Sequence, residues 1–308
     1  LHRHRVEAVH LQVLVFVSEA KDDPLDFALG KAATPGEPAW DAPWGAGRPG
    51  WHIECSAMSI AALGETFDIH GGGMDLKFPH HENEIAQSCG ATDGEFARIW
   101  MHNGFVNVEA EKMSKSLGNF FTIRDALASH RPEAIRYFVL SSHYRSPLNF
   151  SRDNLTQARS AIDRLYTSMR GLVATEAEPD STVLEDFRAA MDDDFNTAEG
   201  LAVLQQAAGE LNRAKTAGEH ERQAGLAAAV VECGQVLGIL NQEPEAWFQS
   251  GGDTVAGMDD DEIQSRIDAR NQARADKNWS EADRIRDELA AAGVQLEDGA
   301  EGTIWKRS

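Results

Sequence analysis

The segment KMSKSLGN at residues 112–119 does most to decide the fold of this chain. It places two lysines, two serines and one glycine in one short stretch. A mobile loop with this composition can close over phosphate groups and stabilise negative charge that develops only during a reaction. The same composition is also typical of a solvated basic turn, because short Lys/Ser runs are common on protein surfaces. The segment therefore predicts a phosphate-handling enzyme only if neighbouring motifs agree.

Seven further blocks surround this segment in a fixed order. Those upstream are GRPGWHIECS at 47–56, DIHGGGMDL at 68–76, FPHHENE at 78–84 and WMHNG at 100–104. Those downstream are HYRSP at 143–147, MDDDFNT at 191–197 and LEDG at 296–299. Together they resemble the cysteinyl-tRNA synthetase family, and KMSKS resembles the signature loop of class I aminoacyl-tRNA synthetases. The resemblance runs from about residue 22 to residue 308.

The resemblance implies an α/β fold class, namely the C-terminal part of a class I synthetase Rossmann-like catalytic domain, followed by an α-helical bundle and a small α+β anticodon-binding unit. The expected boundaries are 1–150 for the catalytic part with its zinc site and KMSKS loop, 151–245 for the bundle, 246–259 for a linker and 260–308 for the anticodon-binding domain.

Local patterns agree with this division. Short strands are predicted at 67–70 and 105–108, and the glycines at 71–73 are predicted to form a turn directly after the first strand. Apolar residues at helical spacing predict the bundle: Ala158, Ile162, Leu165 and Met169. The last segment predicts helices at 260–275 and 280–292 and strands at 294–296 and 303–305.

The first residues depart from the resemblance. The family opens with a nucleotide-binding half that carries a His-Ile-Gly-His signature and a first zinc-ligating cysteine, and this sequence has neither. It begins with Leu1, and residues 1–17 do not resemble the family. We therefore expect an incomplete chain that lacks half of the ATP site and one zinc ligand, and that cannot form the adenylate alone.

Composition bounds the remaining possibilities. The 308 residues are 26% charged and 42% hydrophobic, as in ordinary globular proteins. No apolar run approaches the roughly 20 residues that span a membrane. Three widely spaced cysteines, Cys55, Cys89 and Cys233, form no disulfide framework. We expect a cytoplasmic monomer without membrane contact, and Cys89 and Cys233 are interpreted as small buried hydrophobic residues.

The resemblance implies a zinc site formed by Cys55, His80 and Glu84. His80 and Glu84 are four residues apart in a predicted helix and therefore face the same side. With Cys55 they offer sulfur, nitrogen and oxygen, a ligand set that zinc accepts. An isolated His-x-x-x-Glu is more often a surface pair, and sequence alone does not bring Cys55 to the helix. A metalloprotease HExxH site is excluded, because Ile85 stands where its second histidine is needed.

The resemblance also implies a two-step reaction in which cysteine and ATP give cysteinyl adenylate and pyrophosphate, and cysteine tRNA then takes the acyl group. Zinc would bind the substrate thiol, which distinguishes cysteine from serine because thiolates bind zinc far better than hydroxyls do. Magnesium would accompany ATP. The implied roles are catalysis by Lys112 and Lys115, nucleotide contacts by His70, Gly72, His102 and Lys115, and cysteine contacts by Trp51 and Asp75.

Each of these residues has an ordinary structural alternative. Trp51 could be a core tryptophan, Asp75 could form an Asx turn, and each histidine could be a hydrogen-bonded structural residue. The basic residues between Arg266 and Arg286 outnumber the acidic ones, whereas the whole chain carries a net charge of −21. Local patches must therefore hold an RNA partner. Our candidate anticodon contacts are Arg274, Arg284, Asp298 and Trp305, with a core Trp305 and solvated arginines as the alternative.

Two other functions remain open at this stage. The first is a catalytically inactive tRNA-binding fragment, which the missing nucleotide-binding half would favour. The second is a cysteine ligase that acts on an amino sugar. Such enzymes resemble the catalytic blocks but should lack an anticodon unit, so the segment at 260–308 disfavours them.

Overall fold

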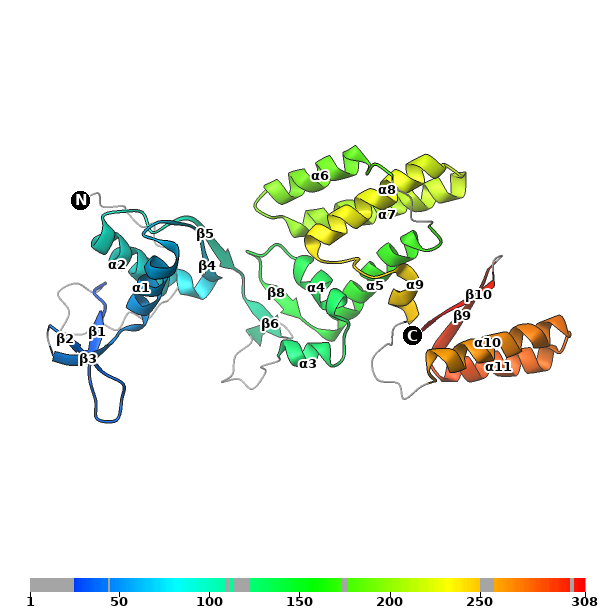
Figure 1. The fold of residues 1–308 in the computed structure, drawn as a ribbon, viewed down its shortest axis with the longest axis horizontal. Coiled ribbons are helices and arrows are strands. Elements are labelled where there is room, and N and C mark those ends of the chain that lie inside the picture. The colour runs from blue at the N-terminus through cyan, green and yellow to red at the C-terminus, as the bar shows by residue number, and fades with distance from the viewer. Residues whose placement is uncertain are drawn as a thin grey trace. The chain divides into compact units, whose positions relative to one another are not determined.

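A computed structural model describes residues 25–43, 45–108, 111–112, 122–172, 177–249, 258–299 and 302–307 (Figure 1). The chain divides into two compact units, Leu1–His102 and Asn103–Ser308, and each is described by itself. Most of the KMSKS segment, residues 113–119, lies outside the described residues.

The first unit combines two small sheets with two helices. β1 (Gly30–Ala32), β2 (Trp40–Ala42) and β3 (Gly45–Pro49) form an antiparallel sheet in the order β1-β3-β2. α1 (Trp51–Leu63) follows, and β4 (Phe67–Gly73) then pairs with β5 (Ala97–Asn103). Two short helical turns, Met74–Leu76 and Lys77–His81, lead from β4 into α2 (Glu82–Thr92).

The glycines after the predicted first strand belong to the strand itself. β4 continues to Gly73, and the chain turns only at Met74. The predicted turn at 71–73 is therefore wrong. A side chain at Gly71 would begin 3.2 Å from the Met101 carbonyl oxygen, so glycine lets the neighbouring strand approach closely.

The second unit begins with a three-stranded sheet. β6 (Val106–Val108) pairs antiparallel with β7 (Glu111–Lys112) and parallel with β8 (Leu148–Phe150). This confirms the strand predicted at 105–108 to within one residue. α3 (Ile123–Leu127) and α4 (Pro132–Leu140) lie between β7 and β8 in sequence. In the register, Asn107 pairs with Lys112 on one side and with Asn149 on the other.

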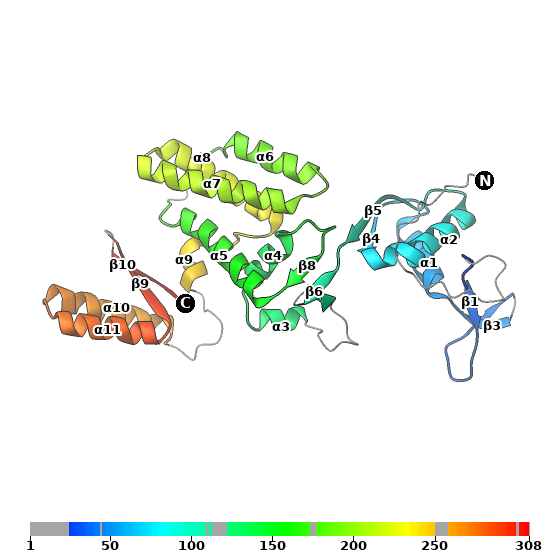
Figure 2. The ribbon, with the colours of Figure 1, turned by 180° about the vertical axis from the view of Figure 1, so that it is seen from behind.

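A helical bundle forms the centre of the second unit. Its members are α5 (Arg152–Met169), α6 (Ser181–Asp192), α7 (Thr197–Ala217), α8 (His220–Leu237) and the short α9 (Pro244–Gln249). Figures 1 and 2 show α7 and α8 lying lengthwise along each other. The four residues whose spacing predicted this bundle are all buried, which confirms that prediction: Ala158, Ile162, Leu165 and Met169.

Local sequence explains where these helices begin and end. The side chains of Ser151, Asp180 and Asn196 accept hydrogen bonds from the first backbone N–H groups of α5, α6 and α7. Such caps stabilise a helix by about 1 kcal/mol each. Gly218 and Gly238 end α7 and α8 in the left-handed conformation that glycine adopts without strain.

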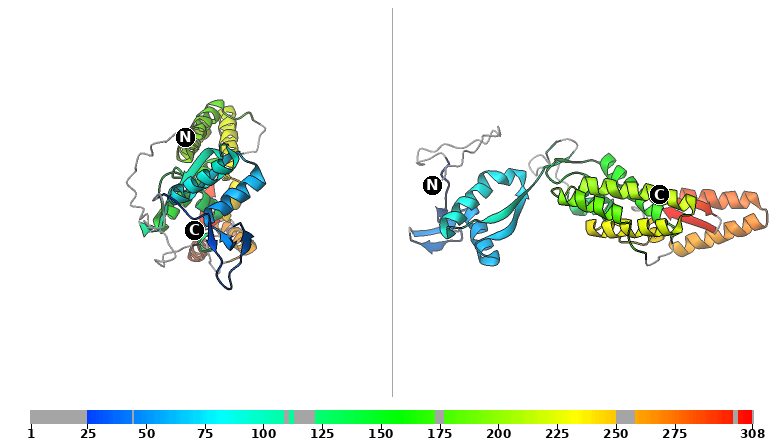
Figure 3. Two further views of the ribbon diagram at one scale, coloured as in Figure 1. Left: turned by 90° about the vertical axis from the view of Figure 1, so that its left-hand side faces the viewer. Right: turned by 90° about the horizontal axis from the view of Figure 1, so that it is seen from above.

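The chain ends in a small α+β unit. α10 (Asp260–Ala275) and α11 (Trp279–Ala291) pack together beside a hairpin of β9 (Val294–Gly299) and β10 (Gly302–Arg307) (Figure 3). Both predicted helices and both predicted strands are confirmed, and the strands are longer than expected. None of the helices in the described ranges is long and apolar enough to cross a membrane.

Candidate metal centre

The start of α1 positions Trp51 and Cys55. The Gly50 N–H donates to the Leu29 carbonyl oxygen at 2.9 Å, and a side chain at Gly50 would begin 2.6 Å from the Ala28 carbonyl oxygen. Only glycine therefore lets the chain turn from β3 into α1 at this point. The turn makes Trp51 the first residue of the helix and places Cys55 one turn later, on the same face.

The segment after β4 supplies the other two predicted metal ligands. His80 and Glu84 are 5% and 1% exposed, although both are polar. His80 Nε2 lies 2.9 Å from Glu84 Oε1, as expected for residues four apart in a helical segment. The structure thus gives this pair a buried position rather than the surface position that is more common for the motif.

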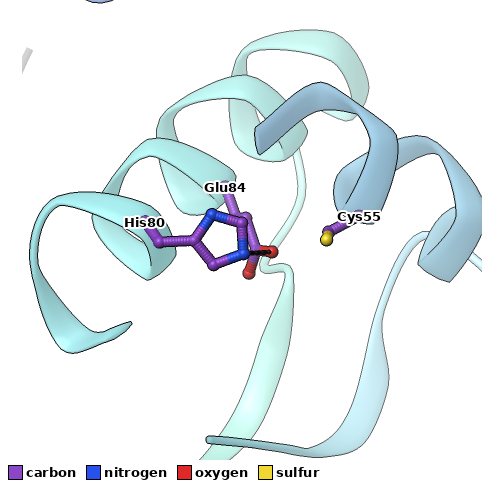
Figure 4. A group of neighbouring side chains, drawn as sticks. All are labelled: Cys55, His80 and Glu84. Atoms are coloured by element: carbon purple, nitrogen blue, oxygen red, sulfur yellow. Dashed lines mark ion pairs between the residues drawn. The ribbon is translucent and has the colours of Figure 1, made fainter. Parts of the chain in front are cut away.

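Cys55 meets this pair across the unit (Figure 4). One ligand atom from each of Cys55, His80 and Glu84 lies within 4.8 Å of the others. The three side chains come from α1, the turn before α2, and α2, and they converge on one point. Sequence spacing could not predict this approach, because 25 residues separate Cys55 from His80.

The donor set fits a zinc ion. Glu84 Oε1 is buried, and it accepts no hydrogen bond from the described residues despite its closeness to His80. Burial raises the pKa of the Cys55 thiol, and the neighbouring Glu84 carboxylate raises it further. A divalent cation would satisfy the carboxylate oxygen and favour the thiolate. Sulfur, nitrogen and oxygen donors are those that zinc accepts.

Trp51 and His52 fix the orientation of His80. The Trp51 ring stacks on the His80 ring with 4.2 Å between centroids and 21° between planes. His52 Nδ1 lies 2.7 Å from His80 Nδ1, so His80 is held through the nitrogen that does not face Glu84. Burial, followed by the nearby His80, lowers the pKa of His52. Partners of this kind commonly orient metal-ligating histidines. Trp51 remains 60% exposed, so it is not a core residue.

A second group of histidines, His70, His81 and His102, contacts Glu84 through His70. His70 Nε2 is 2.7 Å from Glu84 Oε2, and His81 Nδ1 is 2.9 Å from His102 Nε2. His81 is 3% exposed, and burial lowers its pKa to about 4. A side chain at Gly72 would begin 3.0 Å from the His81 ring. Three residues predicted to contact nucleotide, namely His70, Gly72 and His102, therefore gather around His81 and the proposed metal ligands.

The sequence predicted no site role for His52. This residue adjoins Trp51 in the sequence, yet a single histidine carries no periodic signal that reveals contact across the fold. Asp75 lies in the turn after β4, and a side chain at Gly73 would begin 2.5 Å from its Oδ1. The Asp75 carboxylate thus folds back over the glycine run.

The predicted catalytic lysines are described only in part. Lys112 ends β7, but its side chain and all of Lys115 lie outside the described residues. The backbone of Lys112 in β7 pairs with Asn107 of β6.

In the small C-terminal unit, two of the predicted RNA contacts, Arg274 and Asp298, pair with each other, whereas Arg284 pairs with other residues. Asp298 receives two hydrogen bonds from Arg270 and one from Thr303, and Arg274 lies 3.0 Å away. These contacts, led by Arg270, hold the pKa of Asp298 far below its usual value. Arg284 is paired with Glu281 and Glu288 on its own helix.

The two tryptophans of this unit have opposite environments. Trp305 is 4% exposed and packs in the small core with Ile263, Ile267 and Leu289, so its ring is not available to a base. Trp279, at the start of α11, is 61% exposed. Sequence could not separate the two, because exposure depends on the packing of both helices against the hairpin.

Three family models match the sequence in chain order. Residues 1–160 match the model described as tRNA synthetases class I (C) catalytic domain. Residues 186–241 match a DALR domain, and residues 260–305 match a cysteinyl-tRNA ligase anticodon binding domain.

Curated relatives match nearly the whole chain. The cysteine–tRNA ligase of Methylococcus capsulatus is 58% identical over 298 residues, which are 94% of this chain and 63% of the relative. That of Azotobacter vinelandii is 55% identical over 306 residues, 99% of this chain and 66% of the relative. A solved LeuRS–tRNA–LeuAMS complex from Agrobacterium radiobacter matches with 14% identity and a TM-score of 0.47, covering 67% of this chain and 35% of that one. The chain thus spans 63–66% of the length of these curated relatives.

Proposed function

The chain belongs to the cysteinyl-tRNA synthetase family, and from that premise we propose that it serves the ligation of cysteine to its tRNA. In this reaction the cysteine carboxylate attacks the α-phosphate of magnesium-bound ATP, which releases pyrophosphate and leaves cysteinyl adenylate. The 3′-terminal hydroxyl of the tRNA then takes the acyl group and releases AMP. The convergence of Cys55, His80 and Glu84 is the observation that carries the proposal.

Cys55, His80 and Glu84 would hold zinc, and bound zinc would supply a soft Lewis acid that prefers the substrate thiol to a hydroxyl. Trp51 and His52 would keep His80 in place through stacking and through its second nitrogen. The exposed ring of Trp51 would cover the thiol end of the substrate. Asp75 would accept the substrate ammonium group as a charged hydrogen-bond acceptor.

Lys112 and Lys115 would stabilise the negative charge that builds on the phosphates during adenylate formation. Nucleotide contacts are proposed for His70, Gly72 and His102, which surround the buried His81. A histidine that burial keeps neutral can donate or accept a hydrogen bond without repelling a cationic group.

The unit at 260–308 would read the anticodon, as the match of residues 260–305 suggests. We assign the polar contacts to Arg274, Arg284 and Asp298, and the stacking contact to Trp279 in place of the buried Trp305. The bundle at 151–245 would brace the RNA, and 1–150 would carry the chemistry. A cytoplasmic monomer remains our proposal.

The amino-sugar ligase is the weaker alternative, because such an enzyme would have no use for the anticodon-binding domain that residues 260–305 match. An inactive tRNA-binding fragment would keep the RNA-binding part and would not need a thiol-selective metal site. The metal site therefore distinguishes the functions.

Cobalt spectroscopy of the chain tests the proposal. Cobalt should bind with a charge-transfer band from the Cys55 thiolate, and added cysteine should intensify that band while serine should not. Cys55→Ser should lower cobalt affinity by at least about tenfold, whereas the matched Cys89→Ser should not, because Cys89 lies outside the cluster. Equal cobalt binding by both variants, or equal responses to cysteine and serine, would contradict the proposed site.

A further inference from the structure

The helical bundle and the small C-terminal unit have separate hydrophobic cores. Among the described residues, no side chain belongs to both buried clusters. The cluster of the bundle includes Trp247 and Phe248 of α9, whereas the other cluster consists of residues from α10, α11 and the hairpin. Hydrogen bonds and ion pairs join the two parts instead.

α9 gives the hairpin a fixed support. Trp247 of this helix is fully buried and stacks on Tyr166 of α5, with 4.5 Å between ring centroids. Its Nε1 donates a hydrogen bond to Asp163 Oδ1 at 2.6 Å. Arg307 of β10 donates from Nε to the carbonyl oxygen of Gln249, the last residue of α9, at 3.1 Å. The hairpin therefore meets a helix that is anchored in the bundle.

Arg170, which follows the last residue of α5, connects α5, α9 and the hairpin through one guanidinium group. Its Nε and Nη2 donate to Oε1 and Oε2 of Glu245 in α9, both at 2.8 Å. Its Nη1 donates to Glu297 Oε2 of β9 at 2.7 Å. All three nitrogens of the side chain are thus paired, and the side chain is only 12% exposed. Because a two-pronged contact fixes the plane of a guanidinium group, Glu245 aims Nη1 at Glu297.

Both ends of this connection are held by neighbouring contacts. Lys215 Nζ of α7 donates to the Arg170 carbonyl oxygen at 2.8 Å, and the guanidinium lies 4.9 Å from the centre of the Phe248 ring. On the hairpin, Glu297 Oε1 lies 2.9 Å from Lys306 Nζ, which leaves Oε2 for Arg170. Isolated surface ion pairs stabilise little, because two flexible side chains must be ordered. Here the neighbouring contacts already order both side chains.

We propose that Arg170 is a positioning residue that docks the hairpin of the C-terminal unit on α9. Its pair with Glu297 holds the proposed anticodon reader at a fixed position beside the bundle, so that one tRNA meets both surfaces without having to order them first. This inference rests on the proposed function and goes beyond it, because it assigns a role that requires no contact with RNA. Lysine cannot replace Arg170, since it presents one charged nitrogen instead of a planar fork.

Relaxation of backbone amides, measured by NMR on the 308-residue chain, tests the docking directly. In the parent chain, amides of α7 and α10 should report the same rotational correlation time. In Arg170→Ala and Arg170→Lys, α10 should report a shorter time than α7, because the C-terminal unit then moves independently. Arg222→Ala is the matched control and should keep the two times equal. Arg222 also pairs with two glutamates, Glu210 and Glu219, but all three residues belong to the bundle.

A second measurement compares binding of an unmodified cysteine tRNA transcript with binding of its isolated anticodon stem-loop. Arg170→Ala should weaken binding of the whole tRNA by about tenfold or more, because a loose connection lowers the effective concentration of the second surface. Affinity for the stem-loop should stay unchanged, which unfolding of the C-terminal unit would not allow. The double variant Arg170→Ala/Glu297→Gln should lose no more affinity for the whole tRNA than Arg170→Ala does, because both changes remove the same pair.

The outcomes separate this inference from the proposed function. Equal correlation times in Arg170→Ala would overturn the docking role, and independent motion with unchanged tRNA affinity would overturn the positioning role; the proposed function would stand in both cases. Equal losses of affinity for the tRNA and the stem-loop would show that the variant damages the C-terminal unit itself, which would also overturn the positioning role. If the parent chain binds neither RNA, the proposed function fails, and the positioning role fails with it.

Discussion

Asp194 links two sequence motifs that lie about 50 residues apart. It belongs to the MDDDFNT block between α6 and α7, and it accepts hydrogen bonds from Tyr144 and Arg145 of the HYRSP block. Asp194 and Phe195 both have positive φ angles, of 53° and 54°, which are uncommon for residues other than glycine. Surrounding contacts must impose this conformation, and the Arg145 pair is one of them.

The first prediction concerns the pH dependence of this link. Hydrogen bonds from Arg145, followed by Tyr144, lower the pKa of Asp194 from 3.8 to about 2. Because the pKa is lowered in the folded state, the stabilisation is complete above pH 3.8 and is lost as the pH falls towards 2. The parent chain should therefore be more stable than Asp194→Asn at neutral pH, with a difference that shrinks below about pH 4.

Urea unfolding of both chains at several pH values from neutral to about 2 measures this difference across the window between the ordinary and the lowered pKa. Asp192→Asn provides a control, since no hydrogen bond of Asp192 to the HYRSP block is found in the described structure. A stability difference that stays constant over this range would refute the role given to the Arg145 pair.

Residue-level prediction from sequence succeeded where local geometry decides the contact. The spacing of His80 and Glu84 predicted a pair on one face, and the two lie 2.9 Å apart. It could not reveal that His52 lies against His80, because that contact depends on how α1 packs on the turn before α2. The sequence left open whether Trp305 contacts RNA or packs in the core for the same reason, since burial of an aromatic ring is a property of the folded unit.

At the scale of elements, the small C-terminal unit depends on few buried side chains. Its core consists of Ile263, Ile267, Ile285, Leu289, Val294 and Trp305. Trp305 pairs in register with Leu296 across the hairpin, so one side chain connects β10 with both helices. Loss of this ring leaves a large cavity in a core that has little else to fill it.

The second prediction compares the two tryptophans of this unit. Trp305→Ala should destabilise the unit by about 3–5 kcal/mol, the range for a buried aromatic residue, and should unfold much of it. Trp279→Ala should change stability little, because the side chain is 61% exposed, but should weaken tRNA binding by about tenfold through lost stacking.

Urea unfolding followed by circular dichroism gives the stability of each variant, and filter binding gives the affinity for tRNA. Trp279→Phe is the matched control that keeps an aromatic face and should retain most of the affinity. A stable Trp305→Ala variant would contradict the core role, and full tRNA affinity of Trp279→Ala would contradict the stacking role.

The helices and strands were largely predictable, because the residues that begin and end them lie next to them in the sequence. Ser151, Asp180, Asn196 and Asp259 each cap the helix that follows, and glycines end α7 and α8. β4 was predicted too short because three successive glycines usually mark a turn, whereas here Gly71 packs closely against β5, and Gly72 and Gly73 lie against residues that follow β4.

At the scale of the whole molecule, buried apolar side chains are unevenly distributed. The bundle of the second unit has an extensive core, whereas the described part of the first unit buries Phe67, Phe96 and Ala97 as its hydrophobic cluster. All three proposed zinc ligands belong to the first unit. Metal binding should therefore stabilise that unit in particular, because a ligand stabilises the folded state that binds it.

The third prediction follows from this distribution. Zinc at about 100 times its dissociation constant should stabilise the first unit by about 2.7 kcal/mol, and a chelator should remove that gain. Calorimetry should show one metal-dependent transition and one that is unaffected by metal. In Cys55→Ser the metal-dependent shift should disappear, whereas in Cys89→Ser it should remain. A uniform shift of both transitions would show that metal acts on more than the first unit.

Backbone contacts beside the three-stranded sheet also constrain Gly104, which precedes β6. Its N–H donates to the Tyr144 carbonyl oxygen at 2.7 Å, and a Cβ atom there would lie 2.2 Å from the Ser146 carbonyl oxygen. At Gly90, in contrast, an added Cβ would meet nothing within 4 Å, and alanine favours helices. In a library of random single-codon variants selected for folding, codon 104 should return only glycine, while alanine should accumulate at codon 90. Close backbone contacts thus make the codon for Gly104 irreplaceable, whereas the absence of such contacts leaves the codon for Gly90 free to change.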